Sequence, residues 1–541
     1  MLIMKNQLLI RISFIILLIS ALAYFMNFTG KVCAQSSLKA FPEAEGYGAF
    51  AKGGRGNGDQ TTRIFVISNL NDRGSGSLRE CVQANGPRFC IFKVSGYIWL
   101  DSPLEITKPY ITIAGQTAPG DGVTVGRYPL IVKTNDVVVR YMRFRLSDWQ
   151  CQFGESEDDA LTIEGTENII IDHCSTSWGT DETLSLSQDD DLGVINNVTV
   201  QWTFITESLN YSCQYKDGKI VEHGYGSIIG GDMRNNHRVS FHHNLFAHHK
   251  SRNPRFSGKD DHEPGPVIDF RNNLIYNWQT RTGYSSSDEF PRINYIGNYL
   301  KPGPSTLTNG NNAINSGGSG TKVYLDGNYF EEQGGYVGWE IVNGQFTRMN
   351  SPLFPPSISM DDAQSAKDKV LNQAGAVLPA RDEVDNRIVN EVRNRGGRII
   401  NSQNQVGGWP NLSSASPSPD ADGDGMPDHW EDKYGLNKNN SNDNVIDSDG
   451  DGYLNIEEYI NGTAPAQPTP TTVQTCKLGD SDCNQLVEFG DYSSWRTANW
   501  DNAPGDTGDC SGSSRSIYGD ASCDGVVNNF DFSIWRSEMF D

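Results

Sequence analysis

Short runs of alternating apolar and polar residues, rich in β-branched side chains, recur along the chain from about residue 105. Runs with a period of two, bounded by Gly, Asn and Asp, are typical of strands. Their starts lie mostly 26 to 32 residues apart, and the eight clearest are residues 110–113, 137–140, 169–172, 198–201, 239–242, 267–270, 293–296 and 323–326. Because no amphipathic segment of crossover length separates them, the pattern excludes a doubly wound α/β sheet and favours a solenoid.

A repeated asparagine marks the same point in four successive repeats. Asn244, Asn273, Asn298 and Asn328 each precede two apolar or aromatic residues, at spacings of 29, 25 and 30 residues. An Asn at one corner of stacked coils can bond the backbone of its neighbours and tolerates left-handed turn geometry. The repeat predicts an all-β fold, a right-handed parallel β-helix. A β-sandwich with Asn-rich turns is the alternative.

Two helices and two linkers are expected in the second half of the chain. Residues 363–371 and 383–393 carry apolar side chains at helical spacing, which predicts helices on the outside or the end of the solenoid. Residues 411–419 and 464–475, rich in Ser, Pro and Thr, have the composition of linkers. We therefore expect a β-helix domain over 35–410, a module over 411–463 held outside the solenoid, a linker over 464–475 and a last module over 476–541.

The N-terminus has the pattern of a secretory signal peptide. Lys5 and Arg11 precede an apolar run over residues 12–28, and Val32 and Ala34 are the small residues of a signal-peptidase site. We expect cleavage after Ala34, removal of residues 1–34, and a secreted, extracellular or cell-surface protein. An uncleaved membrane anchor is the alternative, because the run approaches spanning length.

Export would permit disulfides among the cysteines. Cys81 and Cys90 are close enough for a local bridge, and Cys151 and Cys213 are candidates for a second. Spacing alone does not fix the pairing. Two further bridges could form in the last module among Cys476, Cys483, Cys510 and Cys523, which would leave Cys174 as the odd cysteine, buried in a strand.

Acidic residues are abundant and unevenly placed. The 541 residues include 67 Asp+Glu against 44 Lys+Arg, a formal net charge of −23, which argues against nucleic acid as a partner. Residues 411–541 alone hold 24 acidic against 6 basic residues. We expect a monomer built from two kinds of module, of which the C-terminal ones bind Ca²⁺.

Two twelve-residue segments in the acidic region match the Ca²⁺-loop pattern of an EF-hand. Alternating carboxylates place oxygens on one side of a tight turn, a Gly permits the turn, and the twelfth residue supplies two more oxygens. A solvated acidic spacer is the alternative interpretation. The predicted ligands are Asp420, Asp422, Asp424, Asp428 and Glu431 in the first loop, and Asp447, Asp449, Asp451, Asn455 and Glu458 in the second.

The last module contains a weaker duplicated loop and helix, with 40 residues between Asp491 and Asp531. It resembles a dockerin, which implies a cohesin-like or cell-surface partner, although its four cysteines and Trp-Arg pairs depart from that pattern. A purely structural module is the alternative. Its candidate Ca²⁺ ligands are Asp480, Asp482, Asn484, Asp491, Asp520, Asp524 and Asp531.

A third set of polar residues lies within the strand repeats. On a solenoid, one face of adjacent coils would bring Asp159, Asp181 and Glu182 beside Arg252. Carboxylates suit Ca²⁺ and clustered basic residues suit an anionic substrate, so together they indicate a polyanion bridged by Ca²⁺. The candidate substrate-binding residues are His223, Lys250 and Arg255.

Residues 41–55, the Ile171-Asp172-His173 motif and Arg252-x-Pro254 resemble polysaccharide lyase family 1, the pectate lyases, over roughly residues 38–410. The resemblance implies a right-handed parallel β-helix and Ca²⁺-dependent β-elimination of de-esterified pectin, polygalacturonate. It also implies that Asp159 and Asp181, with the adjacent Glu182, hold Ca²⁺, that Arg252 is the base, and that Asp172 and His173 are mainly structural.

Three positions depart from the family pattern. Ser185 stands where a second Ca²⁺ acid is expected, Tyr225 near a Lys, and Ser257 at a second Arg; Lys250 is our candidate replacement for the missing Lys. Three alternative functions stay open at this stage: a polygalacturonase-type hydrolase, a non-catalytic carbohydrate-binding β-helix, and a Ca²⁺-independent pectin lyase. The Asp159/Asp181 pair argues against the last of these.

Overall fold

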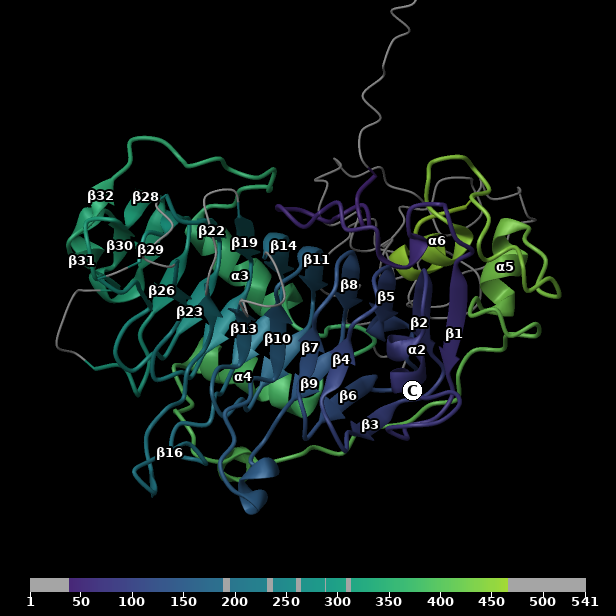
Figure 1. The fold of residues 1–541 in the computed structure, drawn as a ribbon, viewed down its shortest axis with the longest axis horizontal. Helices are drawn as coiled ribbons and strands as arrows, with labels where there is room; N and C mark the ends of the chain where they lie inside the picture. The colour runs from purple at the N-terminus through teal and green to yellow at the C-terminus, as the bar shows by residue number, and fades with distance from the viewer. Residues whose placement is uncertain are drawn as a thin grey trace, which may run out of the picture. The chain divides into compact units, whose positions relative to one another are not determined.

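The computed structural model describes residues 38–187, 195–230, 237–258, 264–287, 289–307 and 313–465. Three sheets form a coil in which most turns contribute one strand to each sheet (Figure 1). Strands that follow one another within a sheet are parallel and come from successive turns, except for the antiparallel pair of β29 and β30 at one end. The predicted parallel β-helix is therefore confirmed. Within the described ranges, no helix has the length and apolarity to cross a membrane.

The eleven-stranded sheet consists of β1 (Arg63–Ile67), β2 (Arg88–Phe92), β5 (Ile111–Ala114), β8 (Val137–Arg140), β11 (Glu167–Asp172), β14 (Asn196–Gln201), β19 (Arg238–His242), β22 (Val267–Arg271), β25 (Arg292–Ile296), β28 (Lys322–Asp326) and β32 (Thr347–Arg348). The eight runs predicted from the sequence are eight consecutive strands of this sheet, β5 to β28.

The nine-stranded sheet consists of β4 (Leu104–Ile106), β7 (Leu130–Val132), β10 (Leu161–Glu164), β13 (Leu184–Ser187), β18 (Ile228–Ile229), β21 (Arg255–Phe256), β24 (Gly283–Tyr284), β27 (Ile314–Ser316) and β31 (Val342–Gly344). The ten-stranded sheet consists of β3 (Gly96–Trp99), β6 (Val123–Gly126), β9 (Arg143–Arg145), β12 (Ser175–Ser177), β15 (Phe204–Thr206), β20 (Leu245–Ala247), β23 (Leu274–Tyr276), β26 (Tyr299–Lys301), β29 (Asn328–Phe330) and β30 (Gly335–Val337).

Short helices and one hairpin complete the described elements: α2 (Leu78–Gln83), α3 (Ala363–Gln373), α4 (Glu383–Asn394), α5 (Asp428–Tyr434), α6 (Asn455–Asn461), the 3₁₀ turns η1 (Gly53–Arg55), η2 (Gly115–Thr117), η3 (Gln150–Phe153), η4 (Glu331–Gln333), η5 (Trp339–Ile341) and η6 (Gln403–Val406), and the antiparallel pair β16 (Tyr215–Lys216) and β17 (Lys219–Ile220).

The core is a stack of apolar side chains in register from coil to coil. Val137, Ile169, Val198 and Val239 are paired in that order across β8, β11, β14 and β19, and all four are fully buried. Period-2 alternation directs such residues inward, and β-branched side chains pack well on a pleated surface. Burial of these stacks is the main source of stability for the solenoid.

The predicted asparagine ladder is present and buried. The side-chain oxygen of Asn273 accepts hydrogen bonds from the backbone and side-chain nitrogens of Asn244, at 3.0 Å each, and Asn298 and Asn328 continue the pattern. In all four rungs the left-handed residue is not the ladder Asn itself but the one before it, as at His243, where φ is 56°. The ladder thus satisfies the backbone on the turn between the eleven- and ten-stranded sheets.

Helices α3 and α4 pack on the ten-stranded sheet, as expected for helices outside the solenoid. Val370 and Ile388 share a buried cluster with Leu245 and Leu274. Each helix begins at an Asp cap: Asp362 accepts from the backbone of Gln364 and Ser365, and Asp382 from that of Asp385. These caps satisfy amide groups that have no partner within the helix.

The N-terminal segment from residue 39 to 51 lies on the outer face of the eleven-stranded sheet. Phe41 and Ala49 are buried with Val138 and Ile170. Gly48 approaches so closely that a Cβ there would lie 2.1 Å from the backbone oxygen of Ile169. The Gly-rich part of the family-like segment is thus explained by close packing of backbone on backbone.

The acidic module also packs on this sheet, beside β1, β2 and β5 (Figure 1). Met426, Trp430 and Ile456 of the module are buried against Phe89 and Ile91 of β2. This contact contradicts our expectation that the linkers hold the module outside the solenoid. The segment over 411–419 had a linker composition, but it also contacts the β-helix, because the amide of Asp121 donates to the backbone oxygen of Ser413.

Two predicted disulfides form within the described residues, Cys81–Cys90 and Cys151–Cys213. The second joins the loop before β10 to the long loop before β18. Cys174 is buried and forms no disulfide within this part of the chain, as expected, although it lies in the turn between β11 and β12.

Candidate active site

The candidate residues lie on the connections that enter the nine-stranded sheet from the ten-stranded sheet. Asp159 precedes β10, Asp181 and Glu182 precede β13, and Arg252 precedes β21. Strands β10, β13, β18 and β21 are neighbours in that order. Parallel coiling therefore aligns four successive loops along one edge, which is where loops carry function on a rigid scaffold.

Asp159 is held by the neighbouring coil. Its Oδ1 accepts from the Glu182 amide at 2.9 Å, and its Oδ2 accepts from the Thr162 hydroxyl at 3.1 Å. Burial, and then the charge of Asp181, raise the pKa of Asp159 to about 7. Both causes disfavour the carboxylate, so a bound cation would relieve an existing electrostatic cost.

Asp181, Glu182 and His223 form one cluster, with a ligand atom of each within 4.8 Å of the others. Glu182 is 3% exposed, and His223 Nε2 contacts Asp181 Oδ1. We had assigned His223 to substrate binding, whereas the structure places it against a predicted metal ligand. This contact could not be predicted from the sequence, because the loop that carries His223 is long.

Arg252 lies at the edge of this cluster. Its guanidinium contacts Glu182 Oε1 and lies over the Tyr225 ring, 4.2 Å from the ring centre. Its backbone has a φ of 56°, a left-handed conformation that is uncommon for a residue with a side chain and is found preferentially at functional sites. Arg252 is thus fixed from two sides, and Tyr225, which stands near the position of the family's Lys, supplies one of them.

The two other basic candidates each have an acidic partner. Lys250 Nζ lies 2.5 Å from Glu222 Oε2, and Arg255 lies 2.6 Å from Glu289 Oε1. Ser257, at the position of the missing second Arg, donates to the same Glu289 oxygen at 2.6 Å. Glu222 and Glu289 could not be found from the sequence, because they come from loops without a motif.

Asp172 and His173 lie in the structural part of the fold, as predicted. Asp172 is fully buried. Its carboxylate forms hydrogen bonds with Arg140 Nε at 2.8 Å, His173 Nδ1 at 2.7 Å and Gln201 Nε2 at 2.7 Å. Burial alone would raise its pKa, but His173, Arg140 and Gln201 together lower it below the usual range. The His173 ring stacks between those of Tyr141 and Trp202 on the turns of neighbouring coils.

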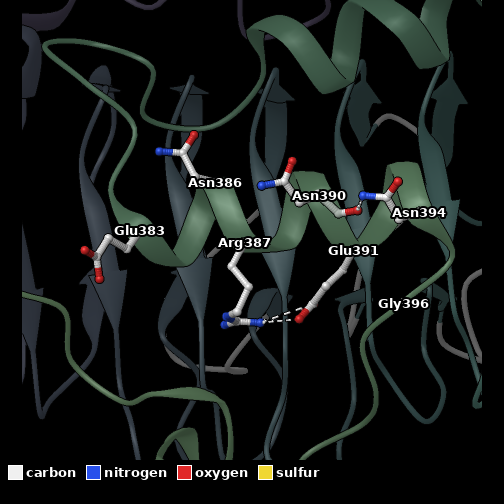
Figure 2. Close-up of a pocket in the computed structure, with 7 residues that line it drawn as sticks. All are labelled: Glu383, Asn386, Arg387, Asn390, Glu391, Asn394 and Gly396. Atoms are coloured by element: carbon white, nitrogen blue, oxygen red, sulfur yellow. Dashed lines mark hydrogen bonds and ion pairs between the residues drawn. The ribbon is translucent and has the colours of Figure 1, made fainter.

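Helix α4 contacts the residues at which two of the active-site loops begin. Figure 2 shows a surface hollow lined by residues of this helix, where Arg387 points toward Glu391. Arg387 also binds both carboxylate oxygens of Glu207, at 2.7 and 2.8 Å, and Glu207 accepts from the Trp178 indole at 3.1 Å. Since Trp178 and Glu207 begin the loops of Asp181 and His223, this hollow belongs to a support and not to the candidate active site.

The two predicted loops of the acidic module adopt matching backbone conformations. Asp420 accepts from the amides of Gly423 and Gly425, and Asp447 accepts equivalently from Gly450 and Gly452. Asp420, Asp422 and Asp424 form one acidic cluster, and Asp447, Asp449 and Asp451 form another.

The ligands predicted at the ninth position of the two loops, Asp428 and Asn455, each make a hydrogen bond within the module. Asp428 Oδ1 accepts from the Ala421 amide at 2.7 Å, and Asn455 is buried with its Nδ2 donating to the backbone oxygen of Asp443. Instead, Asp443 joins Asp424 and Glu431 in a cluster that the sequence did not reveal. Glu458 is buried, and burial with the charges of Asp449 and Asp451 raises its pKa to about 8. The candidate ligands of the last module, from Asp480 to Asp531, lie outside the described residues.

Three comparisons place the chain among known proteins. Residues 102–284 match a family described as pectate lyase. Probable pectate lyase C of Aspergillus flavus is 35% identical over 451 residues, covering 80% of this chain and 95% of the relative. Its counterpart in Emericella nidulans is 35% identical over 448 residues, covering 80% and 94%.

Among solved structures, a pectate lyase bound to a hexasaccharide aligns with a TM-score of 0.46 and 15% identity, over 64% of this chain and 99% of that one. The family assignment follows from the sequence relatives, which match over nearly their whole length. The chain belongs to the pectate lyase family and is a polysaccharide lyase.

Proposed function

We propose that this lyase is secreted, depends on Ca²⁺, and cleaves de-esterified polygalacturonate by β-elimination, with Arg252 as the base. The observation that carries the proposal is the placement of Arg252 against an acidic cluster of Asp181 and Glu182, with Asp159 bonded to the Glu182 amide. An anionic sugar bound there would meet a cation site and a guanidinium at once.

Asp159, Asp181 and Glu182 fit Ca²⁺ by their chemistry, because Ca²⁺ prefers several carboxylate oxygens. The raised pKa of Asp159 supports this, since burial and Asp181 leave its charge poorly compensated. His223 is a less suitable Ca²⁺ ligand, and we assign it to orienting Asp181. A bound Ca²⁺ would withdraw charge from the substrate's C6 carboxylate and so acidify the C5 proton.

Arg252 would abstract that C5 proton. The electrons of the C5–H bond form the C4–C5 double bond, the bond from C4 to the glycosidic oxygen breaks, and the departing oxygen takes up a proton. An arginine paired with a carboxylate stays protonated. We therefore propose that Arg252 leaves Glu182 and gives up a proton to solvent before it accepts the C5 proton, while the Tyr225 ring keeps its side chain in position.

Lys250 and Arg255 would bind the carboxylates of neighbouring galacturonates. Their present partners, Glu222 and Glu289, lie at 2.5 and 2.6 Å, so a substrate carboxylate would exchange with an existing ion pair. Such a site favours free acid groups over methyl esters. It argues for a pectate lyase and against a pectin lyase.

The test is product formation from polygalacturonate with and without a chelator. We expect the absorbance of unsaturated products to appear with Ca²⁺, to vanish with the chelator and to return when Ca²⁺ is added back. Reducing ends without that absorbance would indicate hydrolysis. Unsaturated products formed from methylated pectin in the presence of chelator would indicate a Ca²⁺-independent pectin lyase.

We also propose that the loops over 420–431 and 447–458 bind Ca²⁺ in the manner of EF-hand loops. Their support is the shared loop conformation and the crowding of carboxylates around Asp420 and Asp447. The dockerin-like assignment of residues 476–541, with its cohesin-like or cell-surface partner, stays a prediction from the sequence.

A further inference from the structure

The first loop of the acidic module contains a buried group of three carboxylates. Asp424, Glu431 and Asp443 are 3%, 0% and 7% exposed, and a carboxylate oxygen of each lies within 4.8 Å of the others. Asp424 also belongs to the cluster with Asp420 and Asp422. Asp424 therefore joins two acidic groups that come from two parts of the chain.

Four of the six carboxylate oxygens of Asp424, Glu431 and Asp443 have no hydrogen-bond partner in the part of the chain that the structure describes. These are both oxygens of Glu431, Oδ2 of Asp424 and Oδ1 of Asp443. Burying a charged oxygen without a partner is costly, and in proteins such groups are paired or bind metal.

Asp443 reaches the group from outside the twelve-residue loop. Its Oδ2 accepts from the Asn437 amide at 3.1 Å, and its backbone oxygen accepts from Asn455 Nδ2 at 2.8 Å. These bonds leave Oδ1 directed at Glu431 and Asp424. Asp428 is not part of this group, and its Oδ1 accepts from the Ala421 amide. The site is thus closed by a residue that ties the first loop to the second.

The same segment is packed on the β-helix. A Cβ on Gly425 would lie 3.1 Å from Ile64 of β1 and 3.4 Å from Ile91 of β2. Met426 and Trp430, which follow Asp424 and precede Glu431, are buried with Phe89, Ile91 and Ala114. Ligands and apolar anchors therefore alternate along a few residues, so the conformation of the loop sets the position of the anchors.

Polar contacts surround this apolar patch. Lys93 lies 3.3 Å from Asp420, and Arg55 lies 3.2 Å from Glu457. Arg140 donates to Asn461 at 2.9 Å while it binds the buried Asp172. The module is thus joined to the first coils of the solenoid by apolar and charged contacts.

We propose that Asp420, Asp422, Asp424, Glu431 and Asp443 bind one Ca²⁺ that clasps the acidic module onto β1, β2 and β5 of the catalytic domain. Hard carboxylate oxygens in this number suit Ca²⁺, and five acids without a cation would repel one another. The ion is structural and separate from the catalytic site. The clasp does not depend on the proposed role of Arg252.

Thermal unfolding of the full chain at low Ca²⁺ concentration tests the clasp, in an Asp181→Ala background that weakens Ca²⁺ binding at the catalytic site. We expect Ca²⁺ to raise the Tm relative to chelator. Asp443→Asn and, independently, Glu431→Gln should remove most of that shift and weaken Ca²⁺ binding by at least about tenfold. Asp428→Asn is the matched control, because Asn keeps an acceptor for the Ala421 amide. It should behave like the background protein.

Hydrogen exchange with and without Ca²⁺ tests the attachment itself. Chelation should increase exchange over residues 420–463 and over β1 and β2 together. Increased exchange in the module alone would show a Ca²⁺ site without a clasp, which overturns the proposal. An effect of Asp428→Asn together with none of Asp443→Asn would overturn the ligand assignment. Asp449→Asn, in the second loop, should leave one Ca²⁺ fewer in calorimetric titration but preserve exchange protection of β2.

Discussion

Arg252 is in contact with Glu182 on one side and Tyr225 on the other. These contacts hold its side chain in one position, so the effect of a substitution there can be interpreted. The Arg252 side chain could accept a proton as a neutral guanidine, or it could only bind a carboxylate as a guanidinium. The two roles differ in what a substitution does to turnover and to binding, and this difference makes them separable.

We expect Arg252→Lys to lower kcat by several orders of magnitude while KM changes little. Lys keeps the charge but cannot place a planar group at the C5 proton, whereas Lys250 and Arg255 still bind substrate carboxylates. Steady-state kinetics on polygalacturonate gives both constants. A raised KM with near-normal kcat would make Arg252 a carboxylate clamp, and Lys250 would be the next candidate base.

Asp181→Ala should weaken Ca²⁺ activation and leave the maximal rate partly recoverable at high Ca²⁺. It removes one carboxylate from the cluster, while Asp159 and Glu182 remain. Excess metal compensates for weaker binding by mass action. The measurement is the Ca²⁺ concentration for half-maximal activity. Asp217→Ala, in the exposed turn between β16 and β17, is the control and should leave that concentration unchanged.

Asp172 should stabilise the fold in a pH-dependent manner. Its folded-state pKa is lowered, so its stabilisation is present above the unfolded value of about 3.9 and is lost as pH falls below it. Asp172→Asn should cost about 3 kcal/mol at pH 7 because Arg140 loses its buried partner. Urea unfolding should show this difference narrowing below about pH 3.9. A difference independent of pH would contradict the ionised state of Asp172.

At the scale of elements, the side chains of the asparagine ladder form hydrogen bonds with backbone groups on the turns between sheets. Asn273 both accepts from Asn244 and donates to Asn298 and to the Phe241 backbone oxygen. It is fully buried, so no water can replace these bonds. Each rung depends on the coil on either side of it.

Asn273→Ala should therefore lower the free energy of unfolding by about 2–4 kcal/mol, since it leaves buried polar groups without partners. Asn390→Ala, on the exposed face of α4, is the control and should change it by less than about 0.5 kcal/mol. Denaturant unfolding of both variants gives the comparison. Equal effects would show that the ladder adds nothing beyond a surface asparagine.

Elements were predictable where the sequence repeats its own pattern. The eight strands and the ladder follow from the repeat spacing, because each coil packs on the next in the same way. Both helices follow from the helical spacing of their apolar residues. The left-handed residue before each ladder Asn was missed because the four residues, His243, Asn272, Gly297 and Gly327, are of three different types. Tyr225 and Glu222 were missed for a similar reason, since a long loop has no periodicity to place them.

At the scale of the whole molecule, the contacts that could not be predicted from the sequence are those between residues far apart in the chain. The carboxylates of the first acidic loop were recognised by spacing, but Asp443 lies beyond the loop motif and was not. The packing of Trp430 on Phe89 joins positions more than 300 residues apart. The composition of a Pro- and Ser-rich segment does not show whether the segment is an exposed linker or, as at Ser413, packs on the surface of the domain.

Export and the two described disulfides make one joint prediction about the whole molecule. We expect the exported protein to begin at Gln35 and to carry the Cys81–Cys90 and Cys151–Cys213 bridges, because an oxidising compartment permits them. Cys151–Cys213 closes a loop of 62 residues, so its loss should cost roughly 4 kcal/mol of stability. N-terminal sequencing and mass mapping of cross-linked peptides test the start of the exported chain and its disulfides.

Paired Cys151→Ser and Cys213→Ser substitutions, compared in denaturant with unmodified protein, test the effect of this bridge on stability. A chain that retains Met1 in a membrane fraction would contradict export, and an unchanged unfolding midpoint would show that the bridge does not stabilise the loops around the active site.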